Sequence, residues 1–495
     1  MKFALVNPQL VSQKSDIFSS GIPYFPIELA YLDAVLKKAG HETVVIDSFG
    51  EDPFAFHEFG KGFFFQGISE EQVIEKIPAD VDAIILYASL VTTHSLNSAL
   101  ALKVKEKFGK PVIIFENTQQ VYAYSLQKTF KSLLASGVNY VITGEPEERI
   151  LSLIEAMQGK KALSEVDGLG FIGEGGLPVL NAKKSVVTNL DGLPYPAFED
   201  FPLKNYWKLG YSHGPFSGPY LPMLTSRGCP YGCLFCVVPT TNERKWRPRS
   251  AANVVDEMQH WQNKLGISDF HVEDLNPTIQ KNRINEMCRL IIERGLKITW
   301  KICAGTKVET LDEEELTNMK KAGCVYVSVS PESGSPELMK RMNKPLDHGH
   351  CLKMVKKMSE LGIRSQACFV IGFPTETAED QQMTRDYLKK LVQAGLDETA
   401  IFIITPIPGS QVYETMKPPN DRQENLTFSP KWREDYKQLA AFRKTLYTDF
   451  FLLKGMKQPK RLFRIGFNIL RQKFDLKGEM AFWRLMKTAR HRLGP

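Results

Sequence analysis

The sequence predicts an α/β protein in three parts: an N-terminal Rossmann-like, doubly wound parallel sheet, a partial (β/α)6 barrel and a helical C-terminal region. In the first two parts, short apolar runs alternate with amphipathic helical segments, which is the pattern of buried parallel strands and their crossover helices. The chain of 495 residues is too long for one hydrophobic core, so several domains are expected. The alternation stops after Pro408, where a long amphipathic segment follows.

The predicted domain boundaries follow these changes of pattern. The Rossmann-like domain spans 1–185, a proline-containing linker 186–220, the barrel 221–415 and the helical region 416–495. In the first domain, strands are expected at 2–7, 43–47, 83–87, 111–115 and 140–143, helices at 27–39, 95–107 and 119–135, and a small β-rich extension at 168–187. Strands this short and this apolar indicate a sheet that helices cover on both faces.

The barrel is predicted from six repeats of a strand and a helix. Strands are expected at 221–225, 269–273, 297–303, 324–330, 363–371 and 399–404, and helices at 251–264, 281–294, 312–322, 347–361 and 377–394. In such barrels, ligands sit at the carboxyl ends of the strands. The loop after the first strand and the polar residues that end the later strands are therefore the candidate site.

Three of the eight cysteines stand close together in the loop after the first barrel strand. Cys229, Cys233 and Cys236 have the spacing C-x3-C-x2-C, and Gly228 and Gly232 allow the loop to turn tightly. Three thiolates can hold three irons of a four-iron cube and leave the fourth iron open, whereas a structural zinc site uses four protein ligands. The other five are expected to be small core residues: Cys288, Cys303, Cys324, Cys351 and Cys368.

The cysteine loop, with Phe235 before its last cysteine, resembles the signature of the radical S-adenosylmethionine (SAM) superfamily. The resemblance implies a 4Fe-4S cluster on the three cysteines, SAM at the open iron and a 5′-deoxyadenosyl radical as the reactive species. It also implies a set of SAM contacts: Phe235, Glu273, Asp274, Ser330, Glu332 and Gly372. Glu332 matches the superfamily pattern best, because Glu-Ser-Gly follows an apolar strand. The segment Trp246–Arg249 matches the basic segment after the cluster loop, where a substrate role and an exposed positive loop are both open.

The N-terminal domain resembles the cobalamin-binding domain that precedes some radical SAM barrels, through the stretches 24–32, 40–47 and 141–147. The resemblance implies cobalamin at the strand ends around Ser89, Thr93, Gly144 and Glu145. Two departures stand out. The Asp-x-His-x-x-Gly motif is absent, so a cobalamin would lack a histidine ligand. Glu116-Asn117 stands where a glycine pair is expected after the strand at 111–115, and the two larger side chains would crowd the loop there.

This architecture implies an enzyme that methylates an unactivated carbon with the help of cobalamin. Within the same architecture, the alternative is a cobalamin-linked cyclase or rearrangement enzyme. A methylthiotransferase is disfavoured, because that family carries three more cysteines in its N-terminal domain and the first 228 residues here contain none. A non-catalytic iron–sulfur protein would leave the strand-end carboxylates without a role. The sequence identifies no catalytic side chain.

The C-terminal tail is the basic part of the chain. Residues 456–495 carry a net charge of +9, whereas the rest of the chain sums to −2. Phe482 and Trp483 could insert into an anionic membrane, or the tail could form a helical cap on the barrel. No RNA-binding motif accompanies the charge, so no nucleic acid is expected.

The remaining expectations concern surroundings and partners. The absence of a disulfide framework and of a long apolar stretch indicates a cytoplasmic protein without a transmembrane helix, peripheral at the inner membrane face if the tail binds lipid. The substrate is expected to be a small molecule or a lipid. The resemblance also implies an electron donor of the flavodoxin or ferredoxin type.

Overall fold

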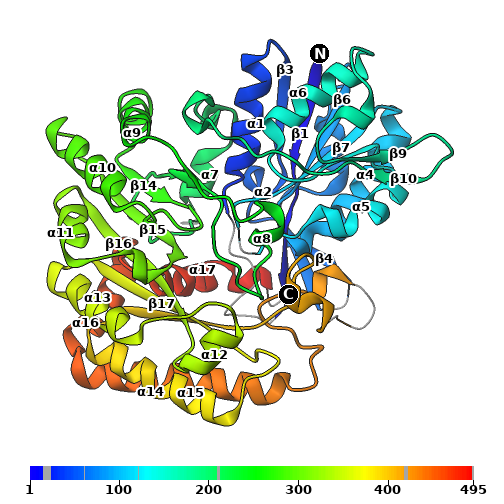
Figure 1. Cartoon of the computed structure of the whole chain (residues 1–495). Helices are drawn as coiled ribbons and strands as arrows, with labels where there is room; N and C mark the ends of the chain where they lie inside the picture. Colours follow the sequence, from blue (N-terminus) through cyan, green and yellow to red (C-terminus); the bar gives the residue numbers. More distant parts are fainter. Residues whose placement is uncertain are drawn as a thin grey trace.

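The molecule consists of two α/β units that lie side by side, with the helices of residues 436–471 along the outer side of the second unit and the last helix nearer the centre (Figure 1). The computed structural model describes residues 1–14, 24–60, 62–120, 122–208, 212–416, 418 and 422–492. The predicted α/β class, with an N-terminal parallel sheet, a barrel-like second sheet and a helical end, is confirmed.

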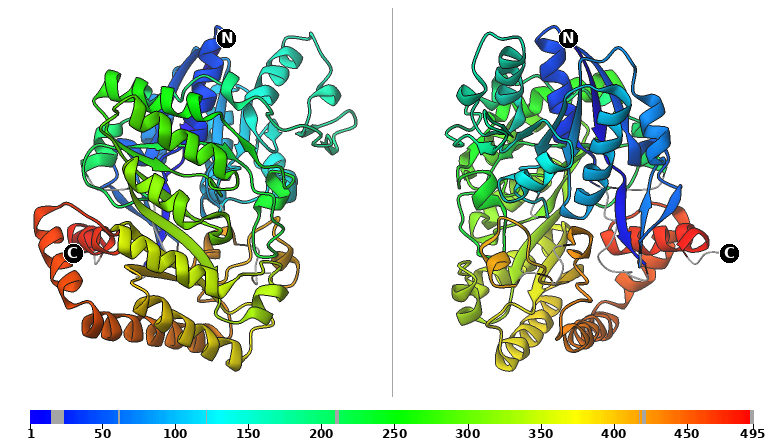
Figure 2. Two further views of the ribbon diagram at one scale, coloured as in Figure 1. Left: turned by 60° about the vertical axis from the view of Figure 1, so that its left-hand side comes forward. Right: turned by 90° about the vertical axis from the view of Figure 1, so that its right-hand side faces the viewer.

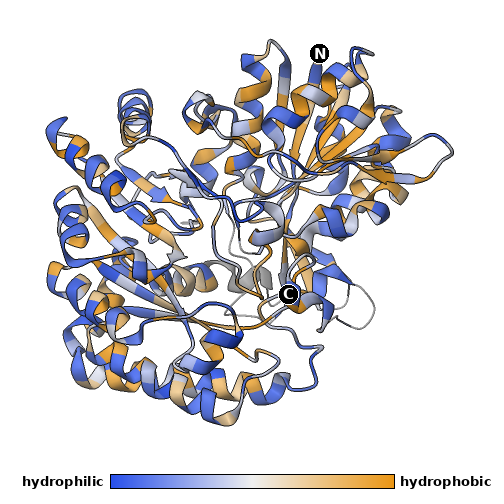
Figure 3. Ribbon diagram, viewed as in Figure 1, coloured by the Kyte–Doolittle hydropathy of each residue, from blue (hydrophilic) through white to orange (hydrophobic). Residues whose placement is uncertain are grey.

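The N-terminal sheet is parallel in its central part, in the order β3-β1-β6-β7-β8. Its strands are β1 (Lys2–Asn7), β3 (Glu42–Asp47), β6 (Ala83–Ala88), β7 (Val112–Glu116) and β8 (Tyr140–Ile142), and β9 (Leu169–Ile172) and β10 (Pro178–Leu180) extend it antiparallel. The helices are α1 (Ile27–Lys38), α2 (Ser48–Glu51), α3 (Glu70–Lys76), α4 (His94–Phe108), α5 (Leu126–Ala135) and α6 (Pro146–Met157). Figure 3 shows the central strands as almost wholly apolar, as strands covered on both faces should be.

The strand order of this sheet indicates where along its edge a ligand would bind. Numbered along the chain, the five parallel strands have the flavodoxin-like order 2-1-3-4-5, whose switch point lies between β1 and β6. Ligands of open α/β sheets bind outside the carboxyl ends of the strands at this point.

A three-stranded antiparallel sheet beside this domain was not predicted. It contains β2 (Leu10–Gln13), β4 (Phe56–Phe59) and β5 (Phe63–Gln66). Its strands have only four residues each, and each is too short to show a period of its own.

The second unit is the predicted six-stranded partial barrel. All six strands are parallel and follow their order in the chain: β11 (Leu221–Met223), β14 (Asp269–Val272), β15 (Thr299–Thr306), β16 (Cys324–Glu332), β17 (Arg364–Ile371) and β18 (Glu398–Ile403). The helices between them are α9 (Ala251–Leu265), α10 (Lys281–Glu293), α11 (Glu313–Lys321), α12 (Pro336–Arg341), α13 (His348–Leu361) and α14 (Ala378–Gln393). Neither α12 nor the short α8 (Val238–Thr241), which follows the cysteine loop, was expected.

The gap between the edge strands β11 and β18 is filled by the last part of the chain. Three helices end it: α15 (Tyr436–Lys457), α16 (Pro459–Arg471) and α17 (Lys477–Arg492). The backbone amides of Lys477 and Gly478 donate to the carboxylate of Glu398 at the start of β18. Phe474 donates its amide to the carbonyl of Phe216, in the segment that leads into β11. The start of α17 therefore completes the wall of the barrel.

No helix in the described part of the chain is long and apolar enough to cross a membrane.

Candidate active site

The cysteine loop connects β11 to α9 and is held in shape by its neighbours. Gly228 has a φ of +78°, and a Cβ there would lie 2.1 Å from the carbonyl oxygen of Lys245. Asp274, at the end of β14, accepts from the amide and hydroxyl of Thr225, both at 2.7 Å, and from the Ser226 hydroxyl. Both oxygens of this buried carboxylate thus fix the start of the loop, so its contacts do not point it at a ligand.

The three thiols of the loop lie near one another and are partly buried. Burial raises the pKa of Cys229, Cys233 and Cys236, and neighbouring cysteines raise the pKa of Cys229 and Cys236 further. The positive charge of Lys344 opposes this shift at all three thiols. Three convergent thiols beside a cation fit a cluster whose ligands must be thiolates.

Glu332 lies beside this loop at the end of β16. Its φ is +56°, it is 5 % exposed, and its carboxylate accepts from the Lys344 Nζ at 2.5 Å. Burial raises the pKa of Glu332, and Lys344 limits the rise. The side-chain amide of Asn343 donates to the carbonyl of Gly232 at 2.7 Å, which ties the Lys344 loop to the cysteine loop.

Lys344 is the main residue that sequence reasoning missed at this place. The available signal was its position in Met342-Asn-Lys-Pro345, a polar turn soon after the Glu332 strand end. A lysine in a polar turn is ordinarily solvated, so the sequence alone gives no reason to place this one against a carboxylate.

Three further predicted SAM contacts have different neighbours: Phe235 lies in the cysteine loop, Ser330 near the end of β16 and Gly372 directly after β17. Phe235 is partly buried against the cluster of Leu338, Met339, Met342, Phe373, Ile404 and Val412. A Cβ on Gly305 would collide with the Ser330 hydroxyl, so these two residues pack closely. Gly372 has a φ of +80°, donates to Glu376 and accepts from Arg433.

Two adjoining cavities lie at the carboxyl edge of the N-terminal sheet, and the second of them extends to the barrel. The first is at the carboxyl ends of β1 and β6, and Ser89 and Thr93 are part of its lining. The second reaches Glu273 in the barrel. The two share four lining residues: Tyr24, Phe25, Tyr87 and Gln120. The cavity at the switch point of the N-terminal sheet is therefore continued, through the second cavity, toward the inside of the barrel.

One polar atom of these cavities is available for a ligand. The side-chain oxygen of Gln120 is buried and has no hydrogen-bond partner among the described residues. The carboxylate of Glu273 accepts from the Nδ1 of His213 at 2.5 Å, and the His213 ring packs edge-on against Tyr24 at 4.8 Å between centroids. Burial lowers the pKa of His213. Neither His213 nor Gln120 belongs to a motif, and sequence reasoning missed both.

Gly144 and Glu145 do not line these cavities. The Gly144 amide donates to the carboxylate of Glu116, which also accepts from the amide of Leu126. Glu116 is fully buried, so the expected crowding of this loop is present in the structure.

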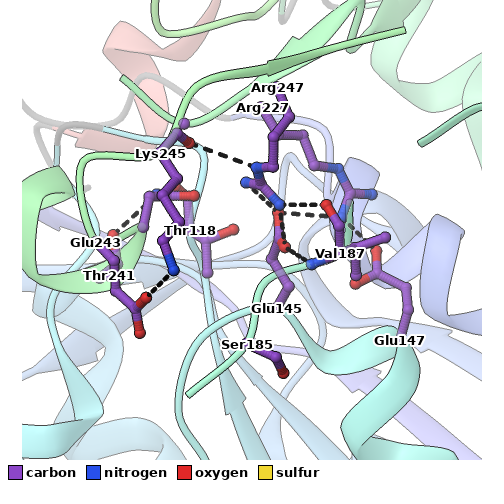
Figure 4. A network of polar contacts seen from close by, with 12 residues as sticks. Thr118, Glu145, Glu147, Ser185, Val187, Arg227, Thr241, Glu243, Lys245 and Arg247 are labelled. Atoms are coloured by element: carbon purple, nitrogen blue, oxygen red, sulfur yellow. Dashed lines mark hydrogen bonds and ion pairs between the residues drawn. The ribbon is translucent and has the colours of Figure 1, made fainter. Parts of the chain in front are cut away.

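Glu145 is part of a buried ion-pair network that joins the two domains (Figure 4). Arg247 binds both oxygens of Glu145, at 2.6 and 2.8 Å, while Arg227 pairs with Glu147 at 2.7 Å. All four side chains are at most 9 % exposed. Arg249 is also buried, against Glu257. The interpretation of Trp246–Arg249 as an exposed positive loop is therefore wrong: its arginines compensate buried carboxylates.

Comparisons with known proteins agree with this geometry. Residues 223–407 match the radical SAM superfamily. The chain is 26 % identical to an uncharacterized methyltransferase, PH0819, of Pyrococcus horikoshii, over 88 % of this chain and 86 % of the relative. It is also 26 % identical to cytidylyl-2-hydroxyethylphosphonate methyltransferase of Streptomyces wedmorensis, over 83 % of this chain and 80 % of that enzyme.

A solved structure shares the whole arrangement of domains. TsrM of Kitasatospora setae, a radical SAM methyltransferase solved with cobalamin and a 4Fe-4S cluster bound, superposes with a TM-score of 0.62. The two chains are 18 % identical, and the match covers 83 % of this chain and 76 % of TsrM. The shared fold includes the N-terminal domain as well as the barrel.

Proposed function

We propose that this chain is a cobalamin-dependent methyltransferase that acts on an unactivated carbon of a small molecule. Residues 223–407 form a radical SAM domain, whose cofactors are a cluster and SAM. This domain follows a domain of the cobalamin type. The observation that carries the proposal is the pair of adjoining cavities between the switch point and the barrel interior. A group bound at the sheet edge there would face a substrate bound beside Glu273. When bound, the cluster and SAM supply hydrogen-atom abstraction, and cobalamin supplies the methyl group.

The chain itself supplies binding and orientation. Cys229, Cys233 and Cys236 would hold the cluster, and the Asp274 contacts keep their loop in place. Glu332 and Lys344 form a carboxylate–ammonium pair that matches the two charges of an amino acid. We infer that SAM separates this pair, so that Glu332 receives the methionine ammonium and Lys344 the methionine carboxylate.

Glu332→Gln is therefore expected to weaken SAM binding by about 1.5–3 kcal/mol, because a charge-assisted hydrogen bond is lost. Equilibrium dialysis of SAM with anaerobically reconstituted enzyme measures this effect. Glu337→Gln is the matched control, since Glu337 forms an exposed ion pair with Lys340 one turn away. Unchanged SAM affinity in Glu332→Gln, at equal iron content, would remove Glu332 from the site.

The switch-point cavity fits part of a corrinoid in its chemistry. Its polar lining consists of neutral amides and hydroxyls, among them Asn7, Ser89, Thr93 and Gln120, and amides also surround a corrin ring. The unpartnered oxygen of Gln120 offers an acceptor for such an amide. Gly144 and Glu145 would serve this site only indirectly, because their contacts are to Glu116 and Arg247.

The chain is expected to bind hydroxocobalamin without a histidine ligand. His41 and His94 line neither cavity, and His94 is buried with its Nδ1 3.0 Å from the Tyr124 hydroxyl. A base-off visible spectrum should appear and remain unchanged in His41→Ala and in His94→Ala, whereas Gln120→Ala should lower the affinity. Failure of the wild-type chain to take up cobalamin while the cluster assembles would reject methyl transfer.

We propose that an acidic carrier of the flavodoxin or ferredoxin type supplies the electron. Arg244 is exposed shortly after the cysteine loop and donates to the carbonyl of Pro230 within it, and Lys245 beside it is exposed and pairs with Glu243. A positive surface beside the cluster favours docking of a negative partner.

A further inference from the structure

Helix α16 presents an unusually apolar surface to solvent. Phe463, Phe467 and Leu470, at positions i, i+4 and i+7, are 82 %, 55 % and 83 % exposed. The end of α15, just before the turn at Pro459, adds Phe451, Leu452 and Met456, which are 52–78 % exposed. Large contiguous apolar patches on a protein surface mark a site of contact with a protein or a membrane.

The segment that carries most of this surface has charges of one sign. Residues 456–473 contain six Lys and Arg and no Asp or Glu. Arg461 and Arg464 form ion pairs with Asp397 and Asp475, while Lys457, Lys460 and Lys473 form none with any described residue. Arg471 lies over the ring of Phe467, at 4.6 Å from its centroid. Basic side chains thus flank the apolar stripe.

The two halves of the basic tail have different environments. In α17, Met480 and Trp483 are 1 % and 7 % exposed and pack with Phe474 and Phe216 on the barrel. The interpretation of Trp483 as a membrane-inserting residue is therefore wrong, because the cap buries it. Helix α16 lies at the rim of the molecule instead, where Figure 2 shows it apart from the N-terminal domain.

We propose that the face made by α16 and the end of α15, with Phe463, Phe467 and Leu470 at its centre, docks on an anionic lipid bilayer. An interfacial helix buries its apolar side among the acyl chains, and lysines attract the anionic headgroups. The absence of acidic residues from 456–473 favours this partner over a second copy of the chain, whose same face would bring like charges together. The proposal does not depend on the proposed reaction.

Sedimentation of the full-length protein with vesicles tests this. Vesicles of phosphatidylcholine with phosphatidylglycerol should bind the protein, pure phosphatidylcholine should bind it much less, and binding should fall steeply with salt. Phe463→Ser/Phe467→Ser/Leu470→Ser should lower the affinity at least about tenfold. Lys457→Gln/Lys460→Gln/Lys473→Gln should lower it on the order of a hundredfold and remove most of the salt dependence.

The matched control is Ile172→Ser/Leu177→Ser, which removes exposed apolar side chains from the β9–β10 extension, outside this face. It should bind vesicles like the wild type. Equal binding by the control and by both α16 variants would overturn the proposal. So would a wild-type chain that ignores vesicles but forms a dimer that Phe463→Ser/Phe467→Ser/Leu470→Ser dissociates.

Discussion

Replacing any one of Cys229, Cys233 and Cys236 with Ala is expected to abolish reductive cleavage of SAM. With two thiolates the loop cannot hold three irons, so the bound iron should fall from about four per chain to a small fraction. The fold should persist, because Asp274 and the glycine turn hold the loop independently of the thiols. Iron content, the visible spectrum and 5′-deoxyadenosine formation are the measurements.

Cys324→Ala and Cys351→Ala are the controls, since both residues are fully buried in the main core. They should keep iron and SAM cleavage. About eight irons per wild-type chain would contradict the single-cluster prediction, and so would full SAM cleavage by a variant that lacks one of the three cysteines.

Glu145→Gln is expected to destabilise the chain by about 3–5 kcal/mol, because it removes the carboxylate that both Arg227 and Arg247 pair with and leaves the two arginines buried. Urea unfolding measures the loss. Glu414→Gln is the matched control: Glu414 also pairs across the two domains, with Lys128, but both side chains are about half exposed. That pair should be worth at most about 1 kcal/mol. Equal losses in the two variants would refute the role of the buried network.

The same network predicts a pH dependence. Burial raises the pKa of Glu145, but the hydrogen bonds from Arg247 and the charge of Arg227 outweigh it and hold the pKa below its ordinary value. A lowered folded-state pKa contributes stability above the unfolded pKa, near 4.3 for Glu, and this stability is lost as the pH falls through the folded value. The stability difference between wild type and Glu145→Gln should therefore shrink below about pH 4.

The pH dependence must be taken from the difference in stability between wild type and Glu145→Gln. Other buried carboxyl groups have raised pKa values, and their contribution to stability changes with pH in the opposite direction. Burial raises the pKa of Glu28 and Glu376 to about 7, and of Glu315 to about 8. Their raised folded-state pKa values favour the folded state at low pH and lose that contribution as the pH rises. Measured alone, the wild-type profile would mix these effects.

The parts of the structure that the sequence predicts are those encoded locally. The barrel strands are apolar runs separated by amphipathic segments, and the cysteine loop carries ligand type, spacing and glycines within twelve residues. Pairings between distant residues leave no such trace. Glu145 with Arg247, Glu273 with His213 and Glu332 with Lys344 each join positions that become neighbours only after folding.

Strand-end carboxylates show the same limit within one motif. Glu273 and Asp274 are adjacent and chemically alike. Glu273 lines a cavity, whereas both oxygens of Asp274 accept hydrogen bonds from Thr225 and Ser226. Successive residues around a strand end point in different directions, and only the packing decides which one meets a ligand.

The closure of the barrel by the start of α17 has a consequence for how the protein is made. The cysteine loop is synthesised more than two hundred residues before Lys477, whose amide donates a hydrogen bond to Glu398 in β18. During that interval β11 and β18 lack the segment that spans them, since Phe474 and Trp483 have not yet joined Phe216. The nascent chain thus has its iron ligands in place while the interior is still open from the side.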